Sequence, residues 1–486
     1  MNIFILIPII VAFVLGAYTF RLKNKPDALV NNYALISTTI ISILSFICLS
    51  FCYGKGITIL KLNDFVTIGF KIDGLSVVFA GVVSFLWPFA TMYATKYMSH
   101  QSHIVRFFAF YTMTFATVLG IAYSANLFTL YLFYETLTFI TLPLVTHKLD
   151  QRDTYAGRKY IYYSMAGAAL SFCGMVIFYY YQSTLNFEHM GSIHSLNSPS
   201  VLIAYLLMFM GFGVKAGVFP MHRWLIAAGV APVTTTALLH AVAVVKSGVF
   251  AVMRVTYYLF DPELLSGTYA QTITILVASI TIVFGSAMAM KSKHLKRRFA
   301  YSTVSQLSYI LLAVTAMNTF GLVAACLHLI FHALIKIVVF YTAGNVAFVA
   351  DKEYVSDIVG YAKVMKYTFL TYTVSILSLI GIPPLGGFFS KFAVAEAIIS
   401  SQNEIAVFGV IALVVSALLT AIYTLQLSII GYLPFKDFDK KKYINVKEAD
   451  KKMVMPMCVI TATMVILSLF SNHLVQAIQN LVGGGF

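Results

Sequence analysis

The chain has 486 residues, of which 60% are hydrophobic and only 10% charged, and its mean hydropathy is +0.86. A soluble domain needs far more polar surface, so this composition excludes one and predicts a polytopic membrane protein. The net charge of +15 does not indicate a nucleic-acid partner, because the basic residues concentrate in every second connection between apolar segments.

Apolar segments recur along the chain and predict an all-α fold with about fourteen transmembrane helices. The first segment, NIFILIPIIVAFVLGAYTF, lacks a basic N-terminal region and a small-residue cleavage site. We therefore interpret it as a retained helix rather than a signal peptide. The predicted spans are residues 2–20, 33–53, 72–97, 106–123, 125–147, 158–181, 200–220, 234–258, 269–290, 300–317, 319–347, 367–398, 404–430 and 453–473.

The basic residues divide the connections between these spans into two classes. Of the 33 Lys and Arg residues, 25 lie in every second connection, and only Lys55, Lys61 and Lys71 lie in the alternate connections. The positive-inside rule therefore predicts that both termini lie outside the membrane. The other five basic residues lie within spans, and they are Lys215, Lys246, Arg254, Lys336 and Lys391.

The five cysteines lie in or beside apolar spans, and no CxxC pair occurs. This usage argues against a disulfide framework and against a zinc or iron–sulfur site. The chain also contains no Walker loop and no dinucleotide fingerprint after a strand. We therefore expect no metal, no cofactor and no chemistry of its own in this chain.

Two predicted spans contain helix breakers flanked by charge, KAGVFPMHRWLIAAGVAP in the seventh and SLIGIPPLGGFFSKF in the twelfth. Broken helices at matching positions of two halves are typical of transport proteins. Each broken span is the fourth of five, in spans 4–8 and 9–13, and two successive units of five helices must have opposite topology. The sequence thus predicts an inverted repeat.

The expected organisation has four parts. They are a three-helix segment over 1–105, a first half-channel over 106–258, a second, inverted half-channel over 259–430, and a basic cytoplasmic loop with a last helix over 431–486. Outside the membrane, residues 54–71 alternate enough to predict a short β-hairpin. The lysine-rich stretch 433–452 is compatible with an amphipathic helix or with a solvated loop.

Ionisable side chains inside the spans are the strongest functional signal. Glu135 lies about ten residues from either end of its span, and Lys215 has no acidic residue within twenty positions. A charge in hydrocarbon costs several kcal/mol unless it is paired, hydrated or neutral, and such residues usually mark ion pathways. Asp73 and Glu396 lie nearer span ends, where water can satisfy them, so we do not include them in the predicted pathway.

The second half continues this series. His328, His332 and Lys336 are spaced i, i+4, i+8 and share one helix face. Histidine titrates near neutrality and relays protons, whereas a metal site would need further ligands that the sequence does not show. The predicted proton-transfer residues are Glu135, Lys215, Lys246, Lys336 and Lys391, with His240, His328 and His332 in support.

These segments together resemble the antiporter-like subunits shared by respiratory complex I, membrane-bound hydrogenases and Mrp-type sodium/proton antiporters, in particular the D-type Mrp subunit. The motifs that carry the resemblance are NLFTLYLFYETLTFITLPL, GFGVKAGVFPMHRWL, APVTTTALLHAVAVVKSGVF, HLIFHALIKIVVFYTAG and SLIGIPPLGGFFSKF. One departure is WLIAAGVAP, where the family usually has WLPDAH or WLPEAH, so the acidic and histidine groups near 225–231 are missing.

The resemblance implies a proton-translocating subunit of a multisubunit complex in the cytoplasmic membrane of a prokaryote. Its expected partners are other membrane subunits, lipid and protons, with sodium as a second candidate ion. The parent complex is left open among an antiporter, a hydrogenase and a quinone reductase. Two alternative functions are a structural anchor with a vestigial channel and a stand-alone secondary transporter.

Overall fold

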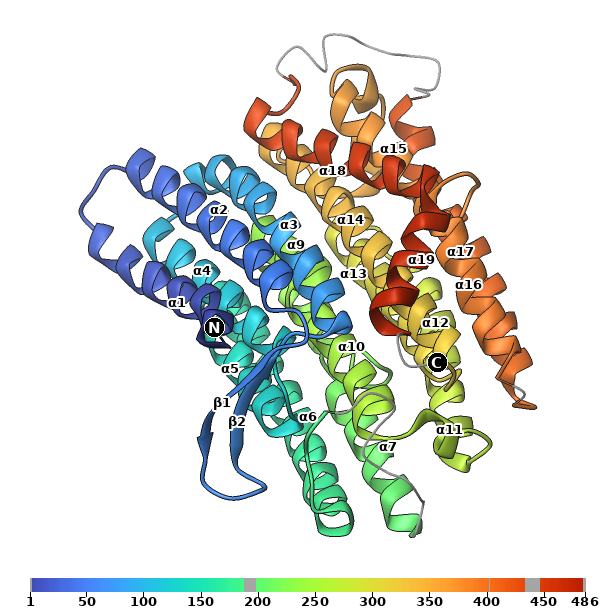
Figure 1. Cartoon of the computed structure of the whole chain (residues 1–486). Helices are drawn as coiled ribbons and strands as arrows, with labels where there is room; N and C mark the ends of the chain where they lie inside the picture. The colour runs from blue at the N-terminus through green and yellow to red at the C-terminus, as the bar shows by residue number, and fades with distance from the viewer. Residues whose placement is uncertain (1, 188–197, 402, 433–445, 484–486) are drawn as a thin grey trace.

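The computed structural model describes residues 2–187, 198–401, 403–432 and 446–483, and helices dominate them (Figure 1). Eleven of the helical segments in these residues are long and apolar enough to cross a membrane. The helices of the N-terminal part and the first predicted unit are α1 (Ile7–Thr19), α2 (Asp27–Phe51), α3 (Gly74–Tyr97), α4 (Ile104–Ala122), α5 (Leu127–Val145), α6 (Gln151–Gln182), α7 (Pro199–Gly213), α8 (Arg223–Ala227), α9 (Val233–Ala237) and α10 (Val244–Arg254).

The second predicted unit begins with the short helix α11 (Pro262–Leu265). Each of the fourteen predicted spans coincides with one helix or with one interrupted helical segment. The prediction of a polytopic all-α membrane protein is therefore confirmed. The remaining helices are α12 (Tyr269–Lys291), α13 (Leu295–Val314), α14 (Thr319–Ala350), α15 (Lys366–Ile380), α16 (Gly386–Ile399), α17 (Ala406–Tyr432), α18 (Lys451–Leu469) and α19 (Ser471–Val482).

Polar side chains at helix starts explain where several of these helices begin. Asp73 caps α3, Asn126 caps α5, Asp150 caps α6 and Asn318 caps α14, each accepting a hydrogen bond from a backbone N–H of the first turn. Such caps satisfy donors that a helix leaves unpaired at its N-terminus, and they stabilise the helix by about 1 kcal/mol. The predicted apolar spans therefore acquire defined ends from single polar residues.

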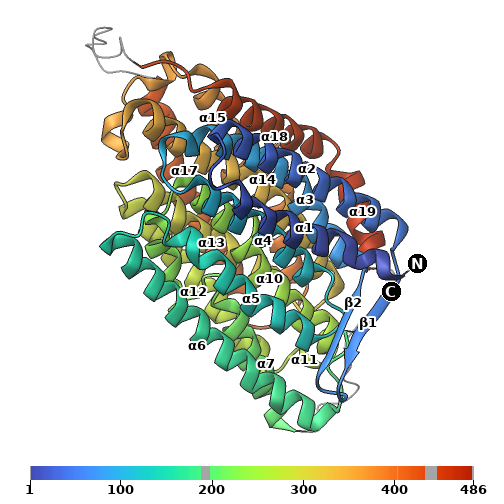
Figure 2. The same ribbon diagram turned by 90° about the vertical axis from the view of Figure 1, so that its left-hand side faces the viewer.

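The predicted hairpin is confirmed by two antiparallel strands, β1 (Gly56–Lys61) and β2 (Thr67–Lys71). The amide Nδ2 of Asn2 donates to the carbonyl of Gly56 at 2.8 Å, so the N-terminus lies against this hairpin. Figure 2 shows the hairpin and both chain ends near the same side of the molecule. Both chain ends therefore lie on the side of the molecule that carries the hairpin.

Both predicted helix breaks are present. Between α7 and α8 the chain leaves the helical path, with Gly217 at φ +77°, and the indole of Trp224 donates to the carbonyl of Val214 at 2.8 Å. Between α15 and α16, Gly381 adopts φ +96°, a left-handed conformation that glycine accepts without strain. The breaks release backbone groups within the membrane, and the inverted relation between the two units stays a prediction.

The centre of the molecule is formed by α9, α10 and α14. The apolar stretches of Val233–Leu259 and Thr319–Ala350 are entirely buried, and α14 packs directly against α9. In Figure 1, α9 and α10 lie between the N-terminal helices and the orange and yellow helices of the second unit. Charged residues on these central helices are consequently shielded from lipid by protein on all sides.

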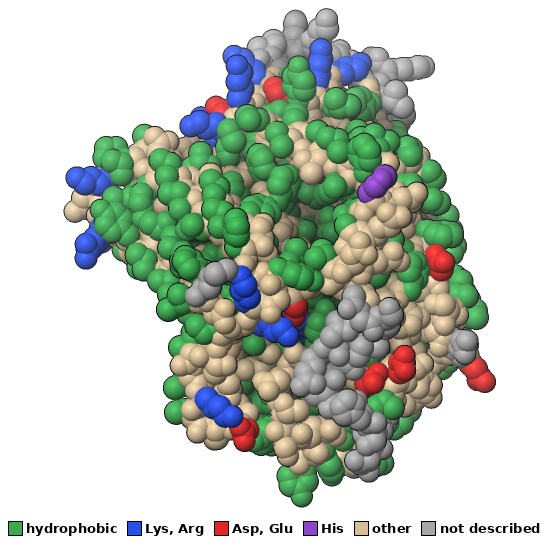
Figure 3. Space-filling view, in the orientation of Figure 1, with side chains coloured by type: hydrophobic (Ala, Val, Ile, Leu, Met, Phe, Trp, Pro, Cys, Tyr) green, Lys and Arg blue, Asp and Glu red, His purple; other side chains and the backbone are tan. Residues whose placement is uncertain are grey.

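The surface agrees with an embedded protein. Figure 3 shows hydrophobic side chains over most of the visible face, while Lys and Arg side chains gather near the connection between α1 and α2 and near the start of α18. This confirms an integral multi-span membrane protein. Most of the predicted basic loop at 433–452 lies outside the described residues, because the structure describes only 446–450 of it before α18.

Candidate functional site

The first predicted pair meets where α5 passes the break after α7. The Nζ atom of Lys215 lies 3.8 Å from Oε1 of Glu135, and the lysine side chain is fully buried. The same ammonium donates to the backbone carbonyl of Tyr134 and lies 3.4 Å from the centroid of its ring, a favourable cation–π position. The ion pair is therefore close but does not include a direct hydrogen bond between lysine and glutamate.

A glycine on α10 allows this helix to approach the first helix break closely. A Cβ atom added to Gly248 would lie 2.5 Å from the backbone nitrogen of Ala216 and 3.1 Å from Cβ of Lys215. Only a residue without a side chain allows this approach of α10 to the helix break. The backbone of α10, which carries Lys246 two residues before this glycine, therefore lies directly against the helix break at Lys215.

The link between the two units is a contact that the spacing did not predict. Nζ of Lys246 on α10 lies 2.5 Å from Nδ1 of His332 on α14, and both side chains are buried. The sequence predicted both residues but assigned the next step to Lys336. The sequence does show that His332 and Lys336, spaced i and i+4, share one face of a helix. A lysine from a neighbouring segment on that face could therefore contact either of them.

The series continues along α14 toward the second helix break. The rings of His332 and His328 lie 6.1 Å apart, and Nδ1 of His328 lies 3.0 Å from the hydroxyl of Ser390 on α16. The ring of Tyr309 on α13 stacks on His328 at 5.4 Å and lies 5.0 Å from Nζ of Lys391. Lys391 is therefore reached through an imidazole and an aromatic ring.

Lys336 does not take part in the contacts that lead from Lys246 through His332 and His328 to Lys391, and its own contacts are with α13. Its Nζ donates to the hydroxyl of Ser302 at 2.6 Å and to the carbonyl of Phe299 at 3.4 Å. The hydroxyl of Ser302 lies 2.7 Å from that of Tyr423 on α17. His240 packs against a phenylalanine ring, and both of its ring nitrogens lack a hydrogen-bond partner among the described residues.

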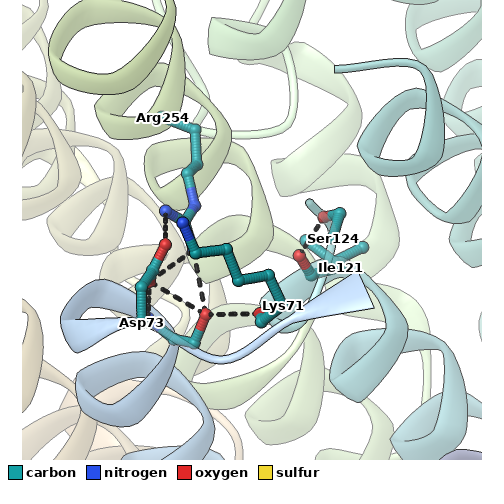
Figure 4. Close-up of polar contacts among 6 residues, drawn as sticks. Lys71, Asp73, Ile121, Ser124 and Arg254 are labelled. Atoms are coloured by element: carbon teal, nitrogen blue, oxygen red, sulfur yellow. Dashed lines mark hydrogen bonds and ion pairs between the residues drawn. The ribbon is translucent and has the colours of Figure 1, made fainter. Parts of the chain in front are cut away.

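A second buried ion pair was missed by the sequence reasoning (Figure 4). Arg254, at the end of α10, donates to both carboxylate oxygens of Asp73 at 2.5 and 2.8 Å and to the hydroxyl of Ser76 at 2.9 Å. The pair could have been anticipated, because a buried arginine needs a carboxylate partner and Asp73 is one of the two acids near span ends. The pair connects the end of α10 to the start of α3, on the side of the hairpin.

Residues near 225–231, where the chain lacks the acidic and histidine groups usual in the family, line a large cavity. This cavity has a volume of about 1210 Å³ and is lined by residues of α6, α8, α12 and α13 and by residues 353–354.

Outside the spans, a hydrogen bond from His294 and the charge of Lys296 hold the pKa of Glu353 at about 2. Among the described residues, no group of three or more His, Cys, Asp and Glu side chains is arranged to hold a metal ion.

Comparison with known protein families identifies two matches. The family described as "NADH:quinone oxidoreductase/Mrp antiporter, TM" matches residues 124–420, which is more than half of the chain. The family described as "NADH-Ubiquinone oxidoreductase (complex I), chain 5 N-terminus" matches residues 60–108. The match over 124–420 includes all the predicted proton-transfer and supporting residues, which are Glu135, Lys215, His240, Lys246, His328, His332, Lys336 and Lys391.

Individual relatives agree with this. NADH-quinone oxidoreductase subunit N of Desulforudis audaxviator is 30% identical over 411 residues, which cover 81% of this chain and 80% of the relative. The putative antiporter subunit mnhA2 of Staphylococcus aureus is 28% identical over 381 residues, 74% of this chain and 47% of the relative. This chain therefore spans about half the length of that antiporter subunit.

Two solved structures share the fold. A chain of the archaeal membrane-bound sulfane sulfur reductase superposes with a TM-score of 0.85 at 21% identity, covering 100% of this chain and 99% of that chain. A chain of the Mrp complex from Dietzia sp. DQ12-45-1b superposes with a TM-score of 0.83 at 19% identity, covering 100% and 97%. The first is described as an archaeal respiratory membrane complex and the second as an Mrp complex.

Proposed function

We propose that this chain, which belongs to the family of NADH:quinone oxidoreductase and Mrp antiporter membrane subunits, translocates protons as one subunit of a multisubunit membrane complex. The observation that carries this proposal is the contact of Lys246 with His332, 2.5 Å apart. It joins titratable groups of the two units inside the fully buried centre of the molecule. A buried amine and imidazole in contact are suited to passing a proton.

Glu135 and Lys215 act as the switch at one end of this series. At 3.8 Å the pair gains several kcal/mol of attraction in a low-dielectric surrounding, and protonation of the glutamate removes that attraction. Lysine suits this role because its ammonium is able to release a proton, whereas a guanidinium is not. Breaking the pair frees the charge of Lys215 to act on Lys246, the next titratable group of the proposed pathway.

His332 and His328 carry the proton from Lys246 toward the second helix break. Their Nε2 atoms are buried without a hydrogen-bond partner in the described residues. Buried polar groups are normally satisfied by protein or by ordered water. We infer that water completes the path at these nitrogens and hands the proton to Ser390 and Lys391.

Protons are the ion that the series favours. Apart from one glutamate, its charged and titratable members are amines and imidazoles, which bind and release protons, whereas hard cations prefer oxygen ligands. We keep sodium as the second candidate ion for the parent complex, because one relative is named as a putative antiporter subunit and an antiporter exchanges two solutes. The four-part division of the chain also belongs to this proposal and rests on the order of the spans and the matching positions of the two helix breaks. The outward orientation of both termini belongs to it as well and rests on the distribution of Lys and Arg.

The proposal is tested by replacing Lys215 in the assembled complex, reconstituted in vesicles with a pH-sensitive dye. We expect Lys215→Ala to lower the rate of proton transport about a hundredfold, as for loss of a positioned proton-transfer group. The matched control is Lys61→Ala, which removes the same charge from the exposed hairpin. Full transport stoichiometry in Lys215→Ala would contradict the proposal.

A second variant separates transport from assembly. Lys215→Arg retains the positive charge beside Glu135 but cannot release a proton at accessible pH. We expect this variant to assemble with its partner subunits and to transport slowly. Transport at the wild-type rate would mean that Lys215 has only a structural, charge-pairing role.

A further inference from the structure

The cavity of about 1210 Å³ at the predicted cytoplasmic side has an unusual charge balance. Eight of its lining residues are Lys or Arg and three are Asp or Glu. It is larger than the 300–1,000 Å³ typical of ligand pockets. The cations come from separate elements, including Arg152 on α6, Arg223 on α8, Lys293 before α13 and Arg297 on α13. They converge on one space only through the tertiary fold.

The three carboxylates in this cavity are already engaged. Asp150 accepts from the backbone N–H of Asp153 at 2.7 Å, and Asp153 accepts from the backbone N–H of Lys148 at 2.6 Å. Glu353 contacts His294 at 3.2 Å and Lys296 at 3.9 Å. Within the described residues, the other seven cations of the cavity have no carboxylate within 4.0 Å. The cavity therefore carries an excess of positive charge that its own acids do not balance.

One wall of the cavity is apolar and reaches into the membrane-spanning part of α12. Met288 and Phe284 lie three and seven residues before the end of this helix, about 5 and 10 Å deeper at 1.5 Å per residue. The ring of Phe284 lies 4.8 Å from that of His222, whose side chain is 3% exposed and whose Nδ1 has no hydrogen-bond partner in the described residues. The floor of the cavity thus combines an apolar surface with one unpaired polar nitrogen.

The cavity also borders surfaces that face lipid. Tyr155 of α6, which lines it, is 58% exposed, and Met290 of α12, one residue before the lining residue Lys291, is 43% exposed. In a bilayer, large exposed apolar side chains on spanning helices contact acyl chains. A molecule in the cavity is therefore able to place an anionic group among the cations and an apolar tail along α12.

We propose that this basic cavity binds an anionic phospholipid, with its phosphate among Lys293, Arg297 and the neighbouring cations and an acyl chain against Phe284 and Met288. Basic pockets between membrane helices on the cytoplasmic side are suited to anionic head groups. Arginine binds phosphate oxygens in a bidentate geometry. This site is separate from the buried proton-transfer series and places lipid beside the helix break that carries Lys215.

The experiment uses the purified, assembled complex and a phosphatidylglycerol that carries a photoreactive group in one acyl chain. After irradiation, cross-linked peptides are identified by mass spectrometry. We expect cross-links on α12 at Phe284–Met288. We also expect Lys293→Gln combined with Arg297→Gln to lower their yield about twenty-five-fold, because each of the two cations near an anionic head group contributes about a factor of five in affinity.

The matched control removes two cations from another connection with the same predicted side. Lys23→Gln combined with Lys25→Gln lies between α1 and α2, away from the cavity, and should leave the cross-links unchanged. Both cavity substitutions are at exposed positions, so the variant complex should assemble, and recovery of all subunits checks this.

Three results would overturn the proposal. One is an unchanged yield in the cavity variant, and another is an equal yield with photoreactive phosphatidylcholine, which carries no net charge. The third is displacement of the lipid by millimolar inorganic phosphate, since this would assign the cavity to a soluble phosphate-bearing anion. Proton transport is measured separately, so failure of this site leaves the transport proposal untouched.

Discussion

The two helix breaks of this chain place a lysine in similar backbone surroundings. At the first break, Lys215 donates to the carbonyl of Tyr134. At the second, Lys391 donates to the carbonyl of Ile380 at 3.0 Å, which is the last residue of α15. Each ammonium also lies over a tyrosine ring, at 3.4 Å in the first case and 5.0 Å in the second.

The difference between the two sites is a carboxylate. Glu135 lies 3.8 Å from Lys215, whereas no described carboxylate lies within 4.0 Å of Lys391. A nearby carboxylate favours the charged form of an amine, and neutral partners provide less of this stabilisation. We therefore propose different roles for the two breaks, a charge-pair switch at Lys215 and a proton-releasing terminus at Lys391.

The largest expected effect comes from removing the carboxylate. Glu135→Ala leaves Lys215 buried without its partner, which should lower the free energy of unfolding by about 3–5 kcal/mol. Lys391→Ala removes one hydrogen bond from a charged donor and should cost about 1.5–3 kcal/mol. The thermal unfolding midpoint of the assembled complex measures both, and equal shifts would remove the proposed distinction between the breaks.

A smaller effect is expected from the contact that connects the two sites. Lys246→Met and His332→Ala each break the contact between α10 and α14, so their effects on stability should not be additive. We expect a coupling free energy of about 1–3 kcal/mol in a double-mutant cycle. Independent effects of the two substitutions on stability, and on transport, would show that the two breaks are not joined through this pair.

The smallest effect is expected at Glu353, which lies outside the spans and belongs to neither helix break, so it serves as a reference for Lys215 and Lys391. Its folded-state pKa of about 2 lies below the ordinary value for glutamate, so the carboxylate contributes stability above about pH 4. That contribution is lost as the pH falls toward 2. Because the side chain is 46% exposed, the loss should be slight, and Glu353→Gln should abolish it in a pH series of unfolding midpoints. An unchanged pH profile in this variant would assign the effect to other groups.

Much of the fold was predictable because apolar length is a strong signal. The fourteen spans, the hairpin and the two helix breaks follow from hydropathy, alternation, and Gly and Pro inside otherwise apolar segments. The amphipathic helix α19 was missed, since its sequence SNHLVQAIQNLV is too polar for a span and follows α18 after a single residue. The candidate site residues could be selected from the sequence because charges inside spans are rare, and their role in proton transfer stays a prediction.

The pairing of those residues was not predictable from spacing. Arg254 and Asp73 are 181 positions apart, and Lys246 and His332 are 86 apart. Helical periodicity identifies the face that a side chain shares with its neighbours, but not which helix packs against that face. His332, rather than Lys336, meets Lys246 in the folded chain, while the ammonium of Lys336 bonds to Ser302 on α13.

By itself the sequence determined that this chain crosses the membrane many times, that it carries titratable groups into the apolar layer, and that its helices break at two matching places. These properties are local, since each depends on the composition of a stretch of about twenty residues. The tertiary structure decided which buried charges are partners, and it assembled the basic cavity from four helices. Contacts between distant segments depend on how side chains interdigitate across helices, and that packing is settled only when the whole chain has folded.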